Sequence, residues 1–346
     1  MTLSAPPRLR VLANAARFAT NYLRGEFDLE PAAPAALLIG ITNRCNLRCD
    51  FCFHADNDIP SVDRRAKGLM PFERFASIVE QARGYCTHLE FGLFGEPALH
   101  PRFVDMVRLA ADAGLTVAIY TNGVLLNPPR GRELILAGPA SVTFSMEGDT
   151  VAEYERLRVG ARWDRVSRNL RAMLDARREL GRRNPRMIVR GIALQGTSRA
   201  PHSRLYESLG VDQVMYVPAT NWSGSLRAPQ DSVRVTPPPA RTELCTFPWL
   251  QLGIDWDGTV VPCCVDFNAK NRLGNIDESP IRDIWHGEAL SALRRALRTR
   301  DRQTICAQTG CAGCSQLGQP ALPLDKKAQL VRMALGELAG RFADGR

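Results

Sequence analysis

The sequence predicts an α/β protein built on a parallel sheet that curls into a partial (β/α)6 barrel. Six strand-like apolar segments recur between residues 35 and 217, with helix-like segments between them. This alternation is typical of βαβ units with right-handed crossovers. The ten cysteines gather mainly in two places, directly after the first predicted strand and beyond a Pro-rich stretch. We therefore expect a barrel followed by a small cysteine-bearing domain.

The barrel is predicted over residues 35–227. Its clearest helix covers 163–180, where Trp163, Val166 and Leu170 recur at helical spacing. Active sites of parallel barrels lie at the carboxyl ends of the strands, so the loops that follow the strands are the first place to look for chemistry. The strand-like segments are residues 35–42, 88–93, 115–120, 140–145, 187–194 and 212–217.

Other segments flank the barrel. Residues 1–34 form a helical extension, with a helix over 8–24 that places Leu12 and Phe18 on or near one side for packing against the barrel. Pro237, Pro238 and Pro239 indicate a stiff linker. The predicted parts after the barrel are the linker at 228–240, the small domain at 241–320 with a hairpin at 251–262, and a closing helix at 321–346.

Composition indicates an enzyme of the cytoplasm. The chain has 346 residues, and 45 basic against 36 acidic residues give a net charge of +9. No basic stripe is interleaved with aromatic residues, so we do not expect nucleic-acid binding. No apolar run approaches the ~18 residues that span a bilayer, and the first residues lack the apolar core of a signal peptide. Ten cysteines in such a chain indicate metal ligation rather than disulfides.

Cys45, Cys49 and Cys52 form a C-x3-C-x2-C run after the first strand. Three thiolates at this spacing can hold three irons of a 4Fe–4S cube and leave the fourth iron open. An open iron can bind S-adenosylmethionine (SAM) and reduce it to a 5′-deoxyadenosyl radical, which abstracts hydrogen from C–H bonds. A structural zinc site is the alternative, but it needs four ligands, usually in paired C-x2-C units.

These cysteines and four later motifs resemble the radical SAM superfamily. The motifs are Gly92-Leu-Phe-Gly-Glu-Pro97, Thr121-Asn-Gly123, Ser145-Met-Glu-Gly-Asp149 and Tyr154-Glu-Arg-Leu-Arg158. The resemblance implies that the first motif binds the methionine amino group, although Phe94 stands where a glycine is common. Arg158 either meets the methionine carboxylate or lies on a helix surface. The residues that the resemblance assigns to SAM are Phe51, Gly95, Glu96, Asn122, Ser145 and Arg158.

The C-terminal cysteines are similar to the SPASM/Twitch extension of this superfamily, which binds auxiliary 4Fe–4S clusters. The resemblance favours one auxiliary cluster, and a four-thiolate zinc ribbon is the alternative. Cys264 can replace its neighbour Cys263 as a ligand or face the substrate, Cys306 can join the cluster instead, and Cys86 is expected in the core. The expected ligands are Cys245, Cys263, Cys311 and Cys314.

A second cluster favours oxidation, because a carbon radical beside a deprotonated hydroxyl group is a strong reductant. The step from Cys245 to Cys263 is similar to that of aminocyclitol dehydrogenases in this superfamily. We therefore expect a dehydrogenase for a small sugar- or aminocyclitol-like molecule, served by an external one-electron donor such as flavodoxin or ferredoxin. The local candidates for the base are Asp255, Asp257 and Asp266, although Asp257 also fits a turn before Gly258.

Three alternatives to the dehydrogenase stay open. An epimerase would use Cys264 or Cys306 as a hydrogen-atom donor. A maturase of ribosomal peptides often carries a leader-binding domain of ~80 residues, for which residues 1–34 are too few. A non-enzymatic zinc-binding protein would contain no iron.

Overall fold

The computed structural model describes residues 7–24, 27, 32–49, 51–54, 66–148, 150–193, 205–220, 222, 244–311 and 314–318. The expected linker at 228–240 and the expected closing helix at 321–346 lie outside these residues.

All six expected strands form, and each pairs in parallel with the next in one sheet. The order β6-β5-β4-β3-β2-β1 follows the chain without interruption, as the βαβ pattern predicts. The six strands are β1 Ala36–Ile39, β2 His88–Phe91, β3 Thr116–Thr121, β4 Ser141–Ser145, β5 Arg186–Ala193 and β6 Gln213–Pro218.

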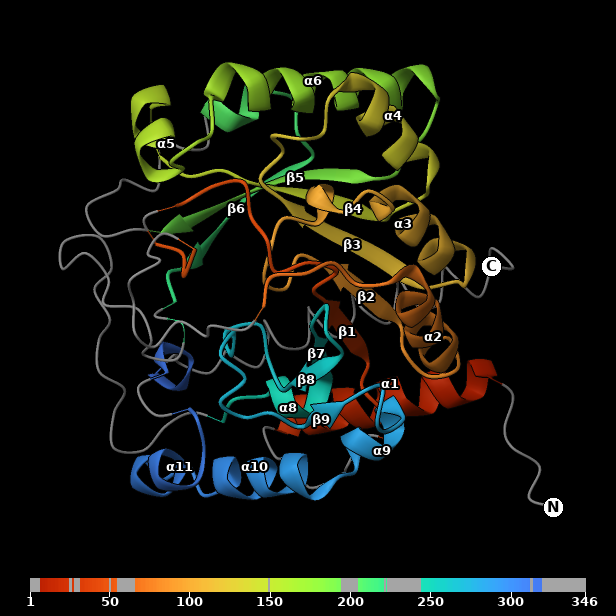
Figure 1. Cartoon of the computed structure of the whole chain (residues 1–346), viewed down its shortest axis with the longest axis vertical. Coiled ribbons are helices and arrows are strands. Elements are labelled where there is room, and N and C mark those ends of the chain that lie inside the picture. The colour runs from red at the N-terminus through yellow and green to blue at the C-terminus, as the bar shows by residue number, and fades with distance from the viewer. Residues whose placement is uncertain are drawn as a thin grey trace.

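The two faces of this sheet differ in burial. Along β2 and β3, fully buried residues alternate with partly exposed ones. The buried residues, such as Phe91 and Ile119, face helices on the outside of the sheet, where the main core lies. The partly exposed residues therefore line the interior of the barrel. The outer helices in Figure 1 are α2 Phe72–Ala82, α3 Phe103–Asp112, α4 Pro128–Leu136 and α6 Trp163–Glu179.

The sheet does not end at β1. Strand β7 (Gln251–Ile254) pairs in parallel with β1, and β8 (Thr259–Val261) and β9 (Gly274–Asn275) follow antiparallel. The expected hairpin is thus confirmed, with Gly258 at its turn in a left-handed conformation. The sequence did not predict that this hairpin extends the barrel sheet to nine strands. A rigid ladder of backbone hydrogen bonds therefore joins the C-terminal cysteines to the first strand.

Helices near the C-terminal end cover β7–β9 (Figure 1). The longest of them, α10, buries Leu290, Leu293 and Leu297 on one side. Arg294 on the same side is also buried, and its guanidinium stacks 4.3 Å from the Trp285 ring centroid. The helices are α8 Phe247–Leu250, α9 Ile281–Trp285, α10 Glu288–Arg298 and α11 Arg302–Gln308.

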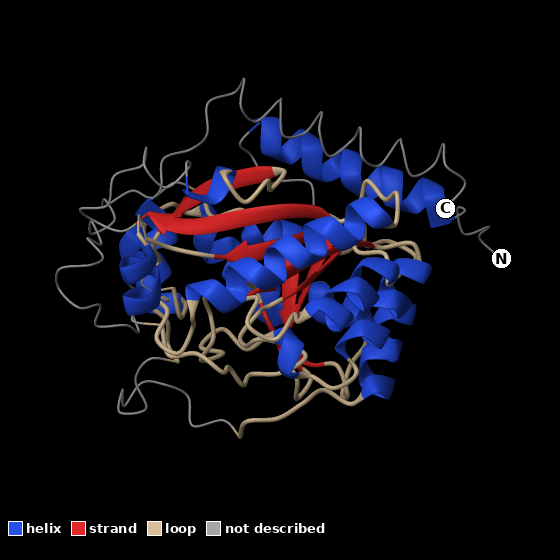
Figure 2. Cartoon of the chain, turned by 90° about the horizontal axis from the view of Figure 1, so that it is seen from above, coloured by secondary structure: helices blue, strands red, loops and turns tan. Residues whose placement is uncertain are grey.

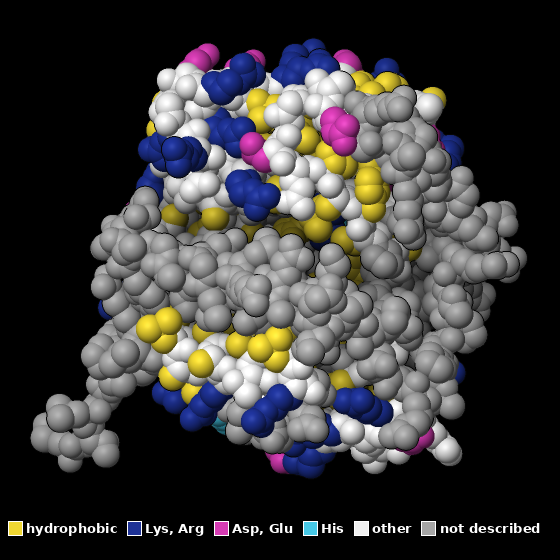
Figure 3. All heavy atoms as spheres, turned by 180° about the vertical axis from the view of Figure 1, so that it is seen from behind, with side chains coloured by type: hydrophobic (Ala, Val, Ile, Leu, Met, Phe, Trp, Pro, Cys, Tyr) yellow, Lys and Arg dark blue, Asp and Glu magenta, His cyan; other side chains and the backbone are white. Residues whose placement is uncertain are grey.

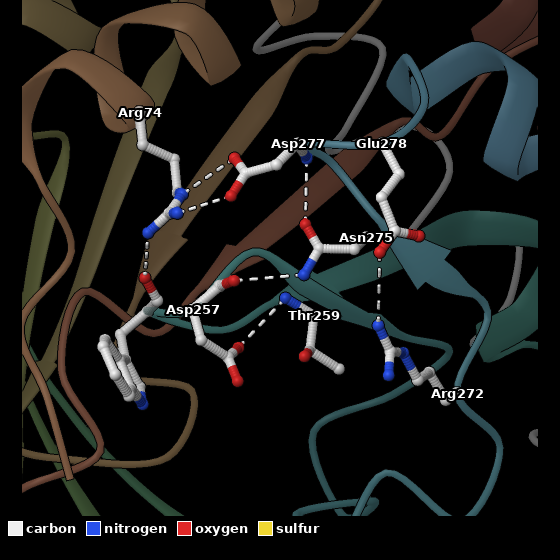
Figure 4. Close-up of polar contacts among 8 residues, drawn as sticks. Arg74, Asp257, Thr259, Arg272, Asn275, Asp277 and Glu278 are labelled. Atoms are coloured by element: carbon white, nitrogen blue, oxygen red, sulfur yellow. Dashed lines mark hydrogen bonds and ion pairs between the residues drawn. The ribbon is translucent and has the colours of Figure 1, made fainter. Parts of the chain in front are cut away.

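Polar contacts fasten the hairpin to the barrel (Figure 4). Arg74 of α2 binds both carboxylate oxygens of Asp277 and donates to the Trp256 carbonyl at 2.9 Å. At the hairpin turn, the carboxylate of Asp257 accepts from the Thr259 amide at 3.0 Å, and the Asp257 carbonyl accepts from the side chain of Asn275 on β9. Asp257 is thus the turn residue that the sequence offered as the alternative to a base.

The N-terminal helix α1 (Pro7–Arg24) runs along one side of the molecule (Figure 2). Asn14 fastens it, because its side chain donates to the Ala33 carbonyl at 2.8 Å and accepts from the Ala33 amide. Phe27 connects Phe18 of α1 to Trp249 of α8 through ring contacts. None of the described helices is long and apolar enough to cross a membrane. On the face in Figure 3, basic side chains lie at both ends with acidic ones among them.

Candidate active site

The three N-terminal cysteines lie together in a buried loop after β1. Burial, helped by the charges of the neighbouring thiols, raises the pKa of Cys45 to about 11 and that of Cys52 to about 12. Burial also raises the pKa of Cys49, whereas the adjacent Arg158 lowers it. Buried thiols that act on one another need a cation to become thiolates, so the donor set fits a positively charged iron cluster.

The turn after β2 packs directly on the start of this loop. A Cβ added at Gly95 would lie 2.3 Å from the Thr42 carbonyl oxygen and 2.6 Å from that of Arg44. The Glu96 amide donates to the Arg44 carbonyl at 2.9 Å. Backbone atoms cannot yield as a side chain does, so only glycine fits at position 95.

The Glu96 carboxylate connects the turn after β2 to the turn after β3. It accepts from the Thr121 hydroxyl at 2.7 Å, the Asn122 amide at 2.7 Å and the Ala98 amide at 3.0 Å. The Asn122 side chain then donates to Asn46 at 2.9 Å and lies 4.0 Å from the Cys45 sulfur. Glu96 and Asn122 therefore hold the cysteine loop in place.

Arg158 follows α5 (Val151–Leu157) and pairs with Glu147, a residue to which the sequence assigned no role. Its Nε donates to one Glu147 oxygen and its Nη2 to the other at 2.7 Å, while Nη1 lies 3.7 Å from the Cys49 sulfur. The exposed fractions are 8% for Arg158 and 1% for Glu147, so the pair is buried. Arg158 is not on a helix surface but beside the cysteine loop.

Aromatic residues surround the end of the cysteine loop. The Phe51 carbonyl accepts from Trp222 Nε1 at 3.0 Å, and the Phe51 ring centroid lies 5.4 Å from the Arg158 guanidinium carbon. Phe53 stacks on Phe267 with 4.4 Å between ring centroids. Because Phe267 follows the C-terminal Cys263-Cys264 pair, this stack joins the two cysteine regions. Trp222 carries no sequence signal that would have placed it here.

The four expected auxiliary ligands line one largely enclosed cavity with mostly apolar walls. Burial raises the pKa of Cys245 to about 12 and that of Cys311 to about 11. Among the described residues, no three Cys, His, Asp or Glu side chains converge as ligands of a single ion. The ligands of a four-iron cube surround a larger group than a single ion, and a shared cavity of four thiols is compatible with that arrangement. The cysteines are Cys245, Cys263, Cys311 and Cys314.

Asp266 and Asn271 support this cavity. The buried Asp266 carboxylate accepts from the Lys270 and Asn271 amides, each at 3.0 Å. The Asn271 side chain accepts from the Gly310 amide at 2.7 Å and lies 3.7 Å from the Cys311 sulfur. Both Asp266 oxygens are therefore engaged in folding the loop, which is unlike an accessible base. Asp255 is fully buried, and its Oδ1 accepts from the Trp256 amide.

The other cysteines have separate surroundings. Cys264 and Cys306 do not line the cavity. Cys264 is partly exposed. The charge of Glu90 raises the pKa of its thiol, and the charge of Arg190 lowers it. Cys86 is buried and donates to the Ala35 and His88 carbonyls, which confirms its expected place in the core.

The barrel interior contains polar residues that the sequence did not single out. Glu90 lies on β2, Tyr120 on β3 and Arg190 on β5, each at a partly exposed position. Ser145, at the end of β4, is paired in register with Arg190. The signal in the sequence was the alternation in His88-Leu-Glu-Phe91, which places a carboxylate on the face opposite the core residues.

Comparison with known proteins agrees with this geometry. The family described as the radical SAM superfamily matches residues 39–184, and an iron–sulfur cluster-binding domain called SPASM matches residues 245–315. A tungsten-containing aldehyde ferredoxin oxidoreductase cofactor-modifying protein of Pyrococcus furiosus is 27% identical over 305 residues, which cover 75% of this chain and 82% of that protein.

Two further likenesses are more limited. A PqqA peptide cyclase of Bradyrhizobium diazoefficiens is 34% identical over 143 residues, which cover 38% of this chain and 36% of the cyclase. The crystal structure of BtrN in complex with AdoMet and 2-DOIA has a TM-score of 0.54 and 19% identity, and the match covers 81% of this chain and 92% of BtrN.

Both family matches fall on the two cysteine regions, and their cofactors are iron–sulfur clusters and SAM. The chain belongs to the radical SAM superfamily and has a C-terminal SPASM domain.

Proposed function

We propose that this chain is a radical SAM oxidoreductase that converts an alcohol of a small sugar- or aminocyclitol-like substrate to a carbonyl group. Cys45, Cys49 and Cys52 hold the SAM cluster, and the four cavity cysteines hold one closed auxiliary cluster. When bound, the first cluster supplies the electron that cleaves SAM to a 5′-deoxyadenosyl radical, and the second supplies a one-electron acceptor. The observation that carries this proposal is the cavity that Cys245, Cys263, Cys311 and Cys314 share.

The residues around the cysteine loop orient SAM. The turn at Gly95 would bind the methionine amino group through its own backbone carbonyl groups, because glycine has no side chain in the way. Arg158 offers its Nη1 both to Cys49 and to an incoming carboxylate, while Glu147 fixes its direction. With SAM bound, Phe51 would contact the adenine and Ser145, at the end of β4, would contact SAM. The electron that starts each turnover comes from an external donor such as flavodoxin or ferredoxin in the cytoplasm.

A screen of cyclitols, aminocyclitols and amino sugars tests the proposal. The anaerobically reconstituted protein is incubated with SAM and a reductant, and both 5′-deoxyadenosine and the mass of each sugar are measured. Oxidation predicts a product two mass units lighter. The variant with Cys45, Cys49 and Cys52 all replaced by Ala should form no 5′-deoxyadenosine and retain about four irons per chain. If no alcohol in the screen loses two mass units, the dehydrogenase proposal is wrong.

An epimerase is the second candidate, because Cys264 is partly exposed and its thiol is near enough to the interior residues Glu90 and Arg190 for their charges to shift its pKa. In deuterated water an epimerase adds one mass unit to its product, since its donor thiol carries solvent deuterium. Cys264→Ala should abolish that gain. A lighter product in both solvents contradicts the epimerase.

A peptide maturase is the third candidate, because a PqqA peptide cyclase is 34% identical to this chain over 143 residues. A short precursor-peptide gene beside the gene of this chain would favour it. The direct measurement is incubation with that peptide, in which a loss of mass from the peptide supports the maturase and an unchanged peptide mass contradicts it.

A further inference from the structure

The inner face of the barrel carries a small group of polar side chains. Glu90, Tyr120 and Arg190 are partly exposed, while the residues beside them in each strand are fully buried on the outer face. Side chains of a strand alternate between its two faces, so these three project into the interior. None of them belongs to the SAM or auxiliary motifs. The fully buried neighbours are Leu89, Phe91, Ile119 and Val189.

The three side chains are close enough to act on one another. The Arg190 guanidinium carbon lies 5.1 Å from the Tyr120 ring centroid. Arg190 lowers the pKa of Glu90, although burial outweighs this and raises it to about 7. In the part of the chain that the structure describes, no hydrogen bond or ion pair engages the Glu90 carboxylate. A largely buried carboxylate that accepts no hydrogen bond has its oxygens available for a group that arrives from outside.

The position of this group matches that of a reacting substrate. On one side, Arg190 is paired in register with Ser145, the residue assigned to SAM. On the other side, the charges of Glu90 and Arg190 shift the pKa of the Cys264 thiol, and Cys264 is the neighbour of the proposed auxiliary ligand Cys263. The group therefore lies between the site of the radical and the site of the electron acceptor.

We propose that Glu90 is the base that takes the hydroxyl proton of the substrate alcohol, and that Arg190, held against Tyr120, binds the same oxygen. This inference rests on the proposed dehydrogenase function. It also replaces Asp266 as the candidate base, because both Asp266 oxygens accept from backbone amides.

The atoms and electrons of this step balance. With SAM and both clusters bound, a 5′-deoxyadenosyl radical would take the hydrogen atom from the carbon that bears the hydroxyl group and form the C–H bond of 5′-deoxyadenosine. The O–H bond breaks, and its proton moves to the Glu90 carboxylate. The remaining electron would leave the carbon for an oxidised auxiliary cluster held by the four cavity cysteines, and the C–O bond would become a carbonyl group. The positive charge of Arg190 stabilises the negative charge that develops on the oxygen.

The proposal has a pH signature. Glu90 must be ionised to accept a proton, so oxidation should become faster as the pH rises through about 7. The ionisable groups that face Glu90 are Arg190 from β5, Tyr120 from β3 and Cys264 from the loop after β8. The pKa of Tyr120 is raised to about 12, so its titration lies far from this range.

The test compares Glu90→Gln with Glu133→Gln, the same change at an exposed position on α4. The probe is scyllo-inosamine deuterated at its ring carbons or, if that is not oxidised, the first alcohol in the screen that is. Glu90→Gln should slow carbonyl formation at least about 100-fold, which is typical of a lost general base. Deuterium transfer to 5′-deoxyadenosine should continue, because hydrogen abstraction precedes proton loss. Glu133→Gln should match the wild-type protein in both measurements.

The outcomes separate the inference from the function on which it rests. If the wild-type protein oxidises no alcohol, the dehydrogenase proposal fails and this inference fails with it. If the wild-type protein oxidises the probe and Glu90→Gln does so at a similar rate, Glu90 is not the base and the dehydrogenase proposal stands. Equal losses of carbonyl formation and deuterium transfer would show that Glu90 only shapes the site. Loss of the rise in rate near pH 7 in Glu90→Gln supports the assignment.

Discussion

Breaking the buried pair of Arg158 and Glu147 should destabilise the protein and disturb the cysteine loop. The guanidinium donates to both carboxylate oxygens, and its third nitrogen lies 3.7 Å from the Cys49 sulfur. A hydrogen bond to a charged group contributes about 1.5–3 kcal/mol, so two such bonds contribute about 3–6 kcal/mol. This agrees with the cost of about 3–5 kcal/mol for leaving one partner of a buried ion pair alone.

A double-mutant cycle measures the coupling. Arg158→Met leaves the Glu147 carboxylate buried without its partner, and Glu147→Leu leaves the guanidinium alone. Each should lower the thermal unfolding midpoint of the reconstituted protein by roughly 4–7 °C, taking a cost of about 3–5 kcal/mol. The double variant should recover most of this loss, because an apolar pair of similar volume is often neutral. It should still cleave SAM more slowly, since Cys49 has lost its contact with Arg158.

An exposed ion pair supplies the control. Arg132 and Glu179 lie 2.9 Å apart with exposed fractions of 47% and 66%, so the matching cycle Arg132→Met and Glu179→Leu should show a coupling below about 1 kcal/mol. The reasoning is refuted if the losses from Arg158→Met and Glu147→Leu simply add in the double variant, or if either single change leaves the midpoint unaltered.

Two further predictions concern the cofactor sites. Gly95→Ala should abolish SAM cleavage, because its Cβ would lie 2.3 Å from the Thr42 carbonyl oxygen. The control Gly84→Ala should be neutral, because no atom lies within 4 Å of its Cβ. A Gly95→Ala variant that still cleaves SAM would contradict this account of the packing. Alanine at any one cavity cysteine should lower the iron content and spare uncoupled 5′-deoxyadenosine formation, while Cys264→Ala should retain its iron. Iron analysis that shows loss in Cys264→Ala but not in Cys263→Ala would reverse the choice between these neighbours.

Local patterns were sufficient for the strands of the barrel and for the two cysteine regions. Strand and helix periodicity depends on near neighbours in the chain, so the six segments could be placed before any tertiary contact was known. The C-x3-C-x2-C run could be interpreted in the same way, because its three thiols are only a few residues apart. The turn role of Asp257 was also open to prediction, since Asp-Gly is a local signal.

Contacts between distant segments were decided only by the tertiary structure. No local pattern shows that β7 would pair with β1, because strand pairing depends on which edge remains free after the barrel has formed. Glu147 gained its partner only when α5 placed Arg158 beside it. Glu90, Tyr120 and Arg190 come from three different strands and meet only in the curved sheet. A sequence shows which residues can carry a charge, but burial and proximity, which set its partner and its pKa, arise only from the fold.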